Sequence, residues 1–290
     1  MKRDIARDIT YASSARTRRG RFVIRGLETL TGRHALLKRA QGYDLAVSEG
    51  AIFWEEMARR YGLVPDILRG SLEDIPREGP VVVVANHPYG ILDGLTLSLL
   101  MGRVRPDGFK VIANDVFVRA PDLANVILPV SFDDTRMAQE MNLAMRQTAL
   151  AYLRGGGLIG VFPGGAVSTP VKPFGPARDP HWRGFSAKLI RQSGATVVPI
   201  HFEGANSRLF HLASHLHATL RLGLLVREFK SRVDQPVRLS VGASISPQEI
   251  AAHPGNQTEL MAWLRARTYA AGQQDDALGF NFDTQKAGCT

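Results

Sequence analysis

The sequence contains a single cysteine and no hydrophobic run long enough to cross a membrane. That cysteine, Cys289, leaves no internal disulfide framework and no thiolate metal site, which is typical of a reducing compartment. No apolar stretch approaches the roughly 18 residues that a transmembrane helix needs, and the basic start of the chain, interrupted by charges, does not resemble a signal peptide. We therefore expect the protein to be cytosolic or attached to a membrane surface.

The sequence patterns of several enzyme and binding classes are also missing. The chain has no Gly-x-Ser-x-Gly nucleophile elbow, no P-loop, no dinucleotide fingerprint joining a strand to a helix and no recognised nucleic-acid-binding pattern. Three histidines, His211, His215 and His217, suggest a metal, because the first two would share a helix face. No cluster of carboxylates accompanies them, so we expect no metal site.

Positive charge is concentrated at the start of the chain. Residues 1–40 hold eleven Lys or Arg against three acids, which is +8 of the formal net charge of +9. A basic segment that also carries apolar residues can lie on an anionic membrane surface. The alternative is a basic arm that is simply solvated. The interleaved apolar residues are Phe22, Val23, Ile24, Leu27 and Leu30.

The hydrophobic content of 44% over 290 residues supports a sizeable core. Helical spacing dominates to about residue 65, and strands then alternate with helices, which predicts one α/β domain with a mixed, largely parallel sheet flanked by helices. We divide the chain into a basic helical region 1–65, a main domain 66–273 and a polar tail 274–290 that we expect to fray. The expected strands are 81–84, 109–113, 126–131, 158–162, 196–202 and 237–241, and the expected helices include 137–153, 185–192 and 258–269.

The most informative stretch is 81–94, in which four valines precede Ala-Asn-His-Pro-Tyr-Gly-Ile-Leu-Asp-Gly. Four consecutive valines predict a strand buried on both faces. His87 follows this strand, at the edge where open α/β sheets carry their chemistry. Pro88 and Gly90 permit a turn that brings Asp93 to His87, and a His held by an Asp is the minimal general base for a hydroxyl. The alternatives are a structural histidine and an Asp93 that only caps the next helix.

A second hydrophobic strand, 158–162, also runs into a turn rich in proline and glycine. Pro163, Gly164 and Gly165 permit a ligand to approach the backbone closely, and amides there can hold an oxyanion or a polar head. If both strands are parallel, this turn lies at the same sheet edge as His87. A turn with no ligand is the alternative.

These stretches resemble the lysophospholipid and glycerol acyltransferase family, most closely its bacterial hemolysin-like branch. The family's active-site block matches 86–93, its Phe-Pro-Glu-Gly block is similar to 162–165, and its Val-Pro-containing block is similar to 193–200. The resemblance covers roughly residues 45–245 and identifies 66–273 as an acyltransferase domain. It implies that His87 and Asp93 are catalytic. The substrate-binding residues that it implies are Asn86, Phe162, Pro163, Gly164, Gly165, Val198 and Pro199.

Departures from the family pattern bear on the acceptor. Gly164 stands where the family motif has a glutamate, and no arginine follows within 166–169, a region that contributes to acceptor binding in phosphate-accepting members. Five residues separate His87 from Asp93, where the family usually has four. Arg136 is the nearest candidate for the family's arginine-bearing block. We therefore expect a lysolipid acceptor without a terminal phosphate, such as lyso-ornithine lipid, ahead of lysophosphatidic acid. Cations further along that can substitute are Arg178, Arg183 and Lys188.

The resemblance implies a membrane-associated O-acyltransferase of lipid and phospholipid biosynthesis that needs no cofactor. Its donor would be an acyl thioester of acyl carrier protein or coenzyme A, and it would act peripherally at the cytoplasmic face of the inner membrane, without nucleic acid. His87 would take the acceptor proton, Asp93 would stabilise the imidazolium, and amides near Gly164 and Gly165 would hold the oxyanion. The alternative is a non-enzymatic, membrane-active protein of the hemolysin kind, which has no need of a His-Asp turn.

Overall fold

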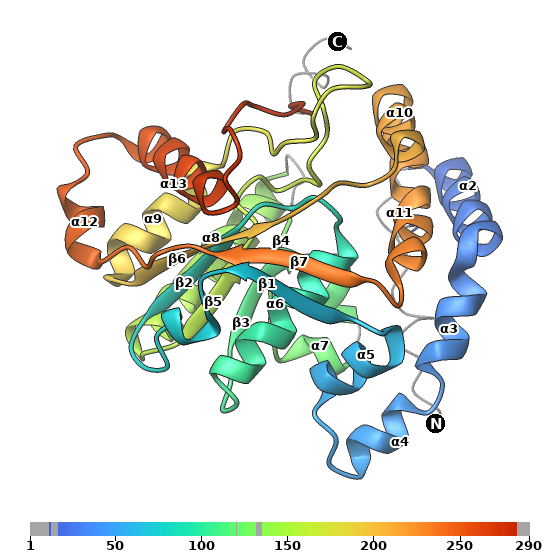
Figure 1. Cartoon of the computed structure of the whole chain (residues 1–290), viewed down its shortest axis with the longest axis horizontal. Coiled ribbons are helices and arrows are strands. Elements are labelled where there is room, and N and C mark those ends of the chain that lie inside the picture. The colour runs from blue at the N-terminus through green and yellow to red at the C-terminus, as the bar shows by residue number, and fades with distance from the viewer. Residues whose placement is uncertain (1–11, 13–16, 120, 132–134, 283–290) are drawn as a thin grey trace.

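The computed structural model describes residues 12, 17–119, 121–131 and 135–282, and at its centre is a seven-stranded sheet with helices on both faces (Figure 1). The mixed, largely parallel α/β architecture predicted from the sequence is confirmed. The strands are β1 (Val64–Arg69), β2 (Val81–Ala85), β3 (Lys110–Asn114), β4 (Ile127–Val130), β5 (Leu158–Val161), β6 (Thr196–Phe202) and β7 (Pro236–Val241).

The strand order is β1-β7-β6-β2-β5-β3-β4, and every neighbouring pair is parallel except β6 and β7. Strand β2 lies between β5 and β6, with Val84 opposite Val161 and Ala85 opposite Ile200. Because parallel strands end at one edge, the segments after β2, β5 and β6 leave the sheet together. The structure therefore brings the two turns singled out in the sequence to one place.

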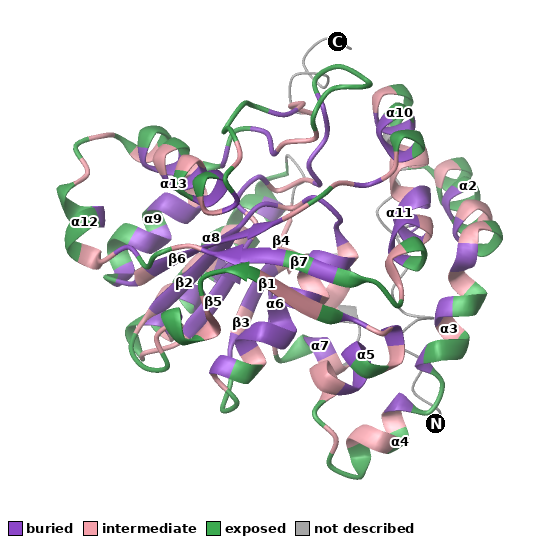
Figure 2. Cartoon of the chain, viewed as in Figure 1, coloured by how far each residue is buried: buried purple, intermediate pink, exposed green. Residues whose placement is uncertain are grey.

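All five residues of β2 are completely buried, and they alternate between two hydrophobic cores. Val81, Val83 and Ala85 pack into one core, while Val82 and Val84 pack into the other. A strand covered on both faces has no reason to alternate apolar with polar residues. The run of four valines is explained by this central position (Figure 2).

Two layers of helices cover the sheet. One core is closed by α3 (His34–Ala40), α4 (Tyr43–Ser48), α5 (Phe53–Tyr61), α6 (Ile91–Val104), α7 (Pro121–Ala124) and α11 (Ala218–Arg232). The other is closed by α8 (Arg136–Arg154), α9 (Gly184–Ser193), α12 (Pro247–Ala252) and α13 (Gln257–Ala271). The remaining elements are α2 (Arg18–Glu28), α10 (Arg208–Leu216), a short π-helix η2 (Thr29–Arg33) and the 3₁₀ turns η3 (Leu72–Asp74) and η4 (Asp115–Arg119).

The sequence analysis did not predict strand β1 at 64–69, which begins where the helical spacing ends. This strand lies at the sheet edge, contains Pro65 and has no fully buried residue, so it lacks the alternation that identifies a strand locally. Its parallel pairing with β7 defines it. The helices before it are not peripheral, because Leu36, Met57 and Tyr61 belong to the same core as β2. The boundary proposed between 65 and 66 stays a prediction.

The expectation that the tail frays is wrong for its described part, 274–282. The amide of Gly279 donates to the carbonyl of Asp179 at 2.8 Å, and the amide of Phe280 donates to the carbonyl of Thr169 at 2.9 Å. Arg265 also donates to the carbonyl of Ala277 at 2.7 Å. Backbone amides that are paired in this way hold the segment against the loop after β5. Residues 283–290, Cys289 among them, and most of 1–16 lie outside the described residues.

Candidate active site

His87 and Asp93 meet across the turn that follows β2. His87 Nδ1 lies 3.0 Å from Asp93 Oδ2, a contact that becomes an ion pair once the ring is protonated. The same oxygen accepts the amides of Tyr89 at 2.8 Å and Gly90 at 2.9 Å, at the start of α6. Gly90 has a φ of +89°, a value that glycine adopts at little cost. Asp93 thus caps the helix and also contacts His87, so the two interpretations of this residue are compatible.

Asn86 fixes the strand end from which His87 projects. Its side-chain amide donates to the carbonyl of Phe202 at 2.9 Å, and its side-chain oxygen accepts the amide of Phe202 at 2.7 Å. Both groups are buried, and these bonds satisfy donor and acceptor at once. Asn86 therefore joins the ends of β2 and β6. It is expected from this geometry to hold the site in place.

The imidazole of His87 is packed at its face, while its Nδ1 lies near Asp93 Oδ2. It stacks on the ring of Phe162, with centroids 4.2 Å apart and planes inclined by 28°. The backbone of His87 is also fixed, because its carbonyl accepts the amide of Ser168 at 2.8 Å and its amide donates to Asp179 Oδ1 at 3.1 Å. With Nδ1 directed to Asp93, Nε2 is the ring nitrogen left for a reacting group.

A cavity of about 530 Å³ is lined by His87 and by mostly apolar side chains. Helix α5 contributes Trp54 and Met57, while α11 contributes Leu225 and Phe229. Cavities of roughly 300–1,000 Å³ with apolar walls and few polar groups are typical of small-ligand sites. A hydrocarbon chain fits this apolar lining. His87 is the one histidine among the lining residues, so it is the imidazole that a hydroxyl group bound in the cavity could contact.

Three arginines from separate elements also line this cavity: Arg33, Arg183 and Arg221. Arg221 Nη2 donates to the carbonyl of Val167 at 3.1 Å, and its guanidinium lies 4.0 Å from the ring centroid of Phe282. Arg33 Nη1 pairs with the fully buried Glu28 at 2.9 Å. The structure therefore supplies positive charge that the turn 162–168 lacks. Of the substitutes proposed from the sequence, Arg183 lines the cavity, whereas Arg178 and Lys188 do not.

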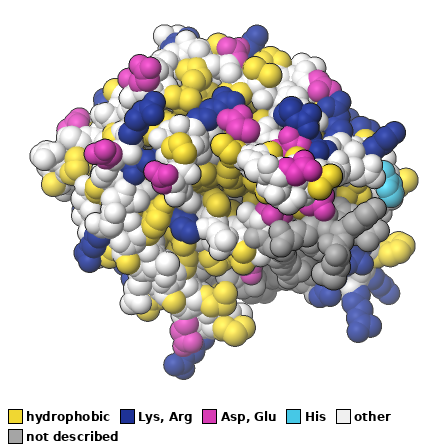
Figure 3. Space-filling model, turned by 90° about the horizontal axis from the view of Figure 1, so that it is seen from below, with side chains coloured by type: hydrophobic (Ala, Val, Ile, Leu, Met, Phe, Trp, Pro, Cys, Tyr) yellow, Lys and Arg dark blue, Asp and Glu magenta, His cyan; other side chains and the backbone are white. Residues whose placement is uncertain are grey.

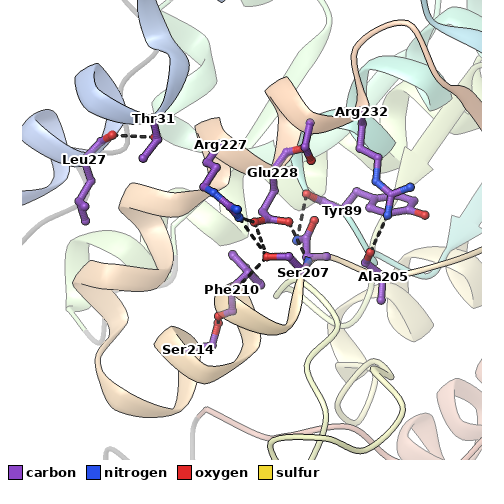
Figure 4. Close-up of polar contacts among 12 residues, drawn as sticks. Leu27, Thr31, Tyr89, Ala205, Ser207, Phe210, Ser214, Arg227, Glu228 and Arg232 are labelled. Atoms are coloured by element: carbon purple, nitrogen blue, oxygen red, sulfur yellow. Dashed lines mark hydrogen bonds and ion pairs between the residues drawn. The ribbon is translucent and has the colours of Figure 1, made fainter.

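The cavity wall formed by α11 is tied to the His-Asp turn (Figure 4). The hydroxyl of Tyr89 donates to the carbonyl of Glu203 at 2.7 Å, and the guanidinium of Arg232 lies 4.7 Å from the Tyr89 ring centroid. Glu228 accepts the amide and the hydroxyl of Ser207, each at 2.7 Å. These contacts hold α11 against the segment that follows β6. They fix the wall relative to the imidazole.

The structure places the glycine turn differently from the sequence interpretation. Phe162, Pro163 and Gly165 line the cavity. The amide of Gly165, however, donates to the carbonyl of Phe162 at 3.0 Å, so it is already used within the turn and is not free for an oxyanion. Gly164 does not line the main cavity and lies against the carboxylate of Asp179. This arrangement does not support the oxyanion role proposed for the Gly165 amide.

Three further residues implied by the resemblance lie outside the cavity. Val198 is completely buried inside β6, where it belongs to the core, and Pro199 is its buried neighbour. The side chain of Arg136 is 92% exposed and pairs with Glu140 at 2.9 Å along α8. One helical turn separates this pair, so Arg136 satisfies its charge on the surface. The structure therefore corrects the assignment of Arg136 to the substrate site.

Sequence reasoning missed Asp179, Arg33 and Arg221. Asp179 is a single acid in a loop and lies 92 residues from His87 in the sequence. No local sequence pattern therefore indicates that the two residues are in contact. Arg33 and Arg221 belong to helical segments, in which a charged residue ordinarily lies on the solvent-exposed face. Within the described ranges, no group of three or more His, Cys, Asp or Glu is arranged to hold a metal, and no helix is long and apolar enough to cross a membrane.

The chain is similar in sequence to known acyltransferases. Residues 68–203 match the family model described as Acyltransferase. A lyso-glycine lipid O-acyltransferase of Bacteroides thetaiotaomicron is 30% identical over 142 residues, which are 49% of each chain. A protein of the same name from Phocaeicola vulgatus is 26% identical over 141 residues, 49% of this chain and 48% of that one. The chain thus matches about half the length of these relatives.

Among solved structures, the 1-acyl-sn-glycerophosphate (LPA) acyltransferase of Thermotoga maritima is similar to this chain. The two share 17% sequence identity with a TM-score of 0.46, over 90% of this chain and 84% of the other.

Proposed function

We propose that this chain, whose residues 68–203 match the Acyltransferase family model, is a member of the lysophospholipid acyltransferase family and transfers a fatty acyl group from a thioester to the hydroxyl of a lysolipid. The observation that carries the proposal is the 3.0 Å contact between His87 Nδ1 and Asp93 Oδ2 beside an apolar cavity of about 530 Å³. A hemolysin-like protein without enzymatic activity has no use for an imidazole oriented by a carboxylate, whereas hydroxyl activation depends on one.

The reaction follows from the position of His87. Nε2 takes the proton of the acceptor hydroxyl while the hydroxyl oxygen attacks the thioester carbonyl. The tetrahedral intermediate then expels the thiolate, which receives the proton from the imidazolium, so the products are an ester and a free thiol. Asp93 stabilises the imidazolium in between, because the ion pair exists only while the ring is charged. The donor is an acyl carrier protein or coenzyme A thioester.

The acceptor that we favour is a lyso-aminolipid whose amino-acid head carries a free carboxylate, such as lyso-ornithine lipid. Arg183 and Arg221 line the cavity that contains His87, and a guanidinium matches the planar carboxylate of such a head. The two relatives named as lyso-glycine lipid O-acyltransferases support an acceptor of this class. The turn after β5 carries no cation of its own, which distinguishes it from the phosphate-accepting pattern.

The acceptor preference can be measured directly. We expect kcat/KM to be higher for lyso-ornithine lipid than for lysophosphatidic acid. Both acceptors are assayed with the same thioester donor, whichever of acyl carrier protein and coenzyme A gives the higher rate. Arg221→Gln should raise KM for this carboxylate-bearing acceptor, because one guanidinium of the cavity is lost. Arg136→Gln removes the same charge from the surface of α8 and serves as control.

Two results would contradict this assignment. A preference for lysophosphatidic acid of tenfold or more, about 1.4 kcal/mol of transition-state binding, would exclude the aminolipid acceptor. Absence of thiol release with every pairing of donor and lysolipid would exclude acyl transfer itself.

We further propose that the chain binds the cytoplasmic face of the inner membrane through α2 and its neighbour α10. Helix α2 buries Ile24 and packs on α11, while Phe22 remains 81% exposed and Leu30, in η2, 85% exposed. Helix α10 also packs on α11 and exposes Leu209 and Leu216 (Figure 1). Lys and Arg side chains gather on the right of Figure 3, the side on which α2 and α3 lie in Figure 1. Exposed apolar and basic groups together suit an anionic bilayer surface.

The membrane contribution of α2 is testable by charge removal. We expect the triple variant Arg18→Ser, Arg19→Ser and Arg25→Ser to bind anionic vesicles on the order of a hundredfold more weakly, since each basic residue near the surface contributes about 1 kcal/mol. Sedimentation with anionic and neutral vesicles measures this, and binding of the unaltered chain should fall with added salt.

A control variant loses the same charge elsewhere. Arg136, Arg154 and Arg267 are exposed on α8 and α13, away from α2, and their replacement by serine should leave vesicle binding nearly unchanged. Equal weakening in both triple variants would show that net charge alone governs binding, and the assignment to α2 would be wrong.

A further inference from the structure

A second carboxylate, Asp179, lies behind His87 and is completely buried. Its Oδ1 accepts the backbone amide of His87 at 3.1 Å and the hydroxyl of Ser168. Its Oδ2 accepts the indole N–H of Trp182 at 2.8 Å. The carboxylate therefore joins the turn after β2, the turn after β5 and the start of α9 at one point. Asp93 reaches the imidazole from α6, so His87 lies between two buried acids.

The surroundings of Asp179 are fixed on every side. Its amide donates to the hydroxyl of Tyr269 at 2.8 Å, and its carbonyl accepts Arg265 Nη2 at 2.9 Å. A Cβ atom placed on Gly164 would lie 3.2 Å from Asp179 Oδ2, tighter than ordinary contact. The glycine in the turn 162–165 thus leaves room for the carboxylate. Residues far apart in the sequence are arranged around this single side chain.

The hydrogen bonds indicate which protonation state fits. The amide of His87 and the indole of Trp182 can only donate, so an ionised carboxylate satisfies all three partners. If Asp179 were protonated, its O–H group would also need an acceptor, and among these three partners only the hydroxyl of Ser168 can accept a hydrogen bond. Burial raises the pKa of Asp179, and the bonds from Ser168, Trp182 and the His87 amide oppose that rise. Charge-assisted bonds of this kind are about twice as strong as neutral ones.

We propose that Asp179 is a positioning residue of the acyl-transfer site, which fixes the backbone of His87 and adds a second negative charge near the imidazolium. This inference rests on the proposed function. A histidine that acts as a general base must be held in position, and its protonated form must be stabilised during the reaction. The charge acts across a buried region in which electrostatic interactions are stronger than in water.

The charged groups around His87 determine the direction of the expected change. Asp93 from α6 and Asp179 from the loop before α9 favour the protonated ring, while Arg33, Arg183 and Arg221 line the same cavity and oppose it. Loss of one negative charge therefore lowers the proton affinity of His87. The acid limb of the kcat profile, where a protonated base is inactive, should move to lower pH.

The test uses Trp182→Phe as reference chain. In Asp179→Asn alone, the new amide N–H₂ would face the indole N–H, a conflict between donors that can disturb folding. Trp182→Phe removes that donor, so the double variant Asp179→Asn with Trp182→Phe differs from its reference by the carboxylate charge. Asparagine still offers an oxygen to His87 and Ser168. Thermal unfolding of both chains checks that they are folded.

Two measurements compare the double variant with its reference. The NMR titration of the His87 ring should move to lower pH, and the plateau of kcat should fall on the order of tenfold, with the acid limb moved in the same direction. Ser168→Ala in the same reference removes a hydrogen bond but keeps the charge, and it should leave the His87 titration unmoved.

An unchanged His87 titration, or a lower kcat with an unmoved acid limb, would show that Asp179 is only structural and would overturn the proposal. The titration does not depend on turnover. If the unaltered chain transfers no acyl group, the proposed function fails by itself, while the coupling between Asp179 and His87 is still decided.

Discussion

Replacement of His87 by alanine is expected to abolish measurable acyl transfer and to leave the thermal unfolding of the chain nearly unchanged. A positioned general base contributes about 10²–10⁴ to the rate, and in the proposed mechanism the ring also returns the proton to the leaving thiolate. The side chain of His87 is 19% exposed and borders a cavity, and Asp93 Oδ2 keeps the amides of Tyr89 and Gly90 as donors when the imidazole is removed. The measurement is kcat on a lysolipid that the unaltered chain acylates.

A matched control for His87→Ala is His34→Ala. His34 is an exposed residue of α3 and does not line the cavity, so its loss removes an imidazole without touching the site. We expect this variant to keep its turnover. Near-normal kcat in His87→Ala on the same substrate would show that another group accepts the proton, and the mechanism would be wrong.

Substitutions of Asp93 are expected to separate catalysis from stability. Asp93→Asn keeps an oxygen for the amides of Tyr89 and Gly90 but loses the charge that stabilises the imidazolium, so we expect a fall in kcat of about 10²-fold or more with modest loss of stability. Asp93→Ala loses the cap as well, which typically costs about 1–2 kcal/mol, and leaves two buried amides unpaired. Its free energy of unfolding should therefore fall further than that of Asp93→Asn.

Asn256→Ala is the control for the capping part of this argument. Asn256 caps α13, where its side-chain oxygen accepts the amides of Thr258 at 2.8 Å and Glu259 at 3.1 Å, remote from the cavity lining. We expect a loss of roughly 1 kcal/mol on chemical denaturation with unchanged kcat. Should Asp93→Asn keep full activity, the carboxylate of Asp93 would be a helix cap alone.

The His-Asp turn was accessible from the sequence because its determinants are local. Four valines predicted the buried strand, Pro88 disfavoured helix at His87, and Gly90 allowed the turn that brings Asp93 within 3.0 Å of the imidazole. These preferences arise from backbone sterics and from burial on two faces, which act between near neighbours. The order and type of most strands and helices after residue 80 followed from hydrophobic periodicity for the same reason.

Contacts between distant segments were decided by the tertiary structure. Arg136 was assigned to the substrate site by its place in the chain, but its position on α8 turns it to solvent. Arg33 and Arg221, by contrast, come from η2 and α11, which are far apart in the sequence, and they line one cavity. A charged residue in a helical pattern gives no indication of whether its face meets water or a cavity, because that depends on which helix packs beside it.

The sequence by itself therefore determined the strand that carries His87, the turn that presents Asp93 and the class of the sheet. Only the tertiary structure decided that Asp179 supports His87 from 92 residues away, that Gly164 accommodates this carboxylate, and that residues 274–282 are held against the loop after β5. Local preferences are set by a few neighbouring dihedral angles, whereas a buried acid acquires its role from donors that converge on it only when the sheet and its helices have packed together.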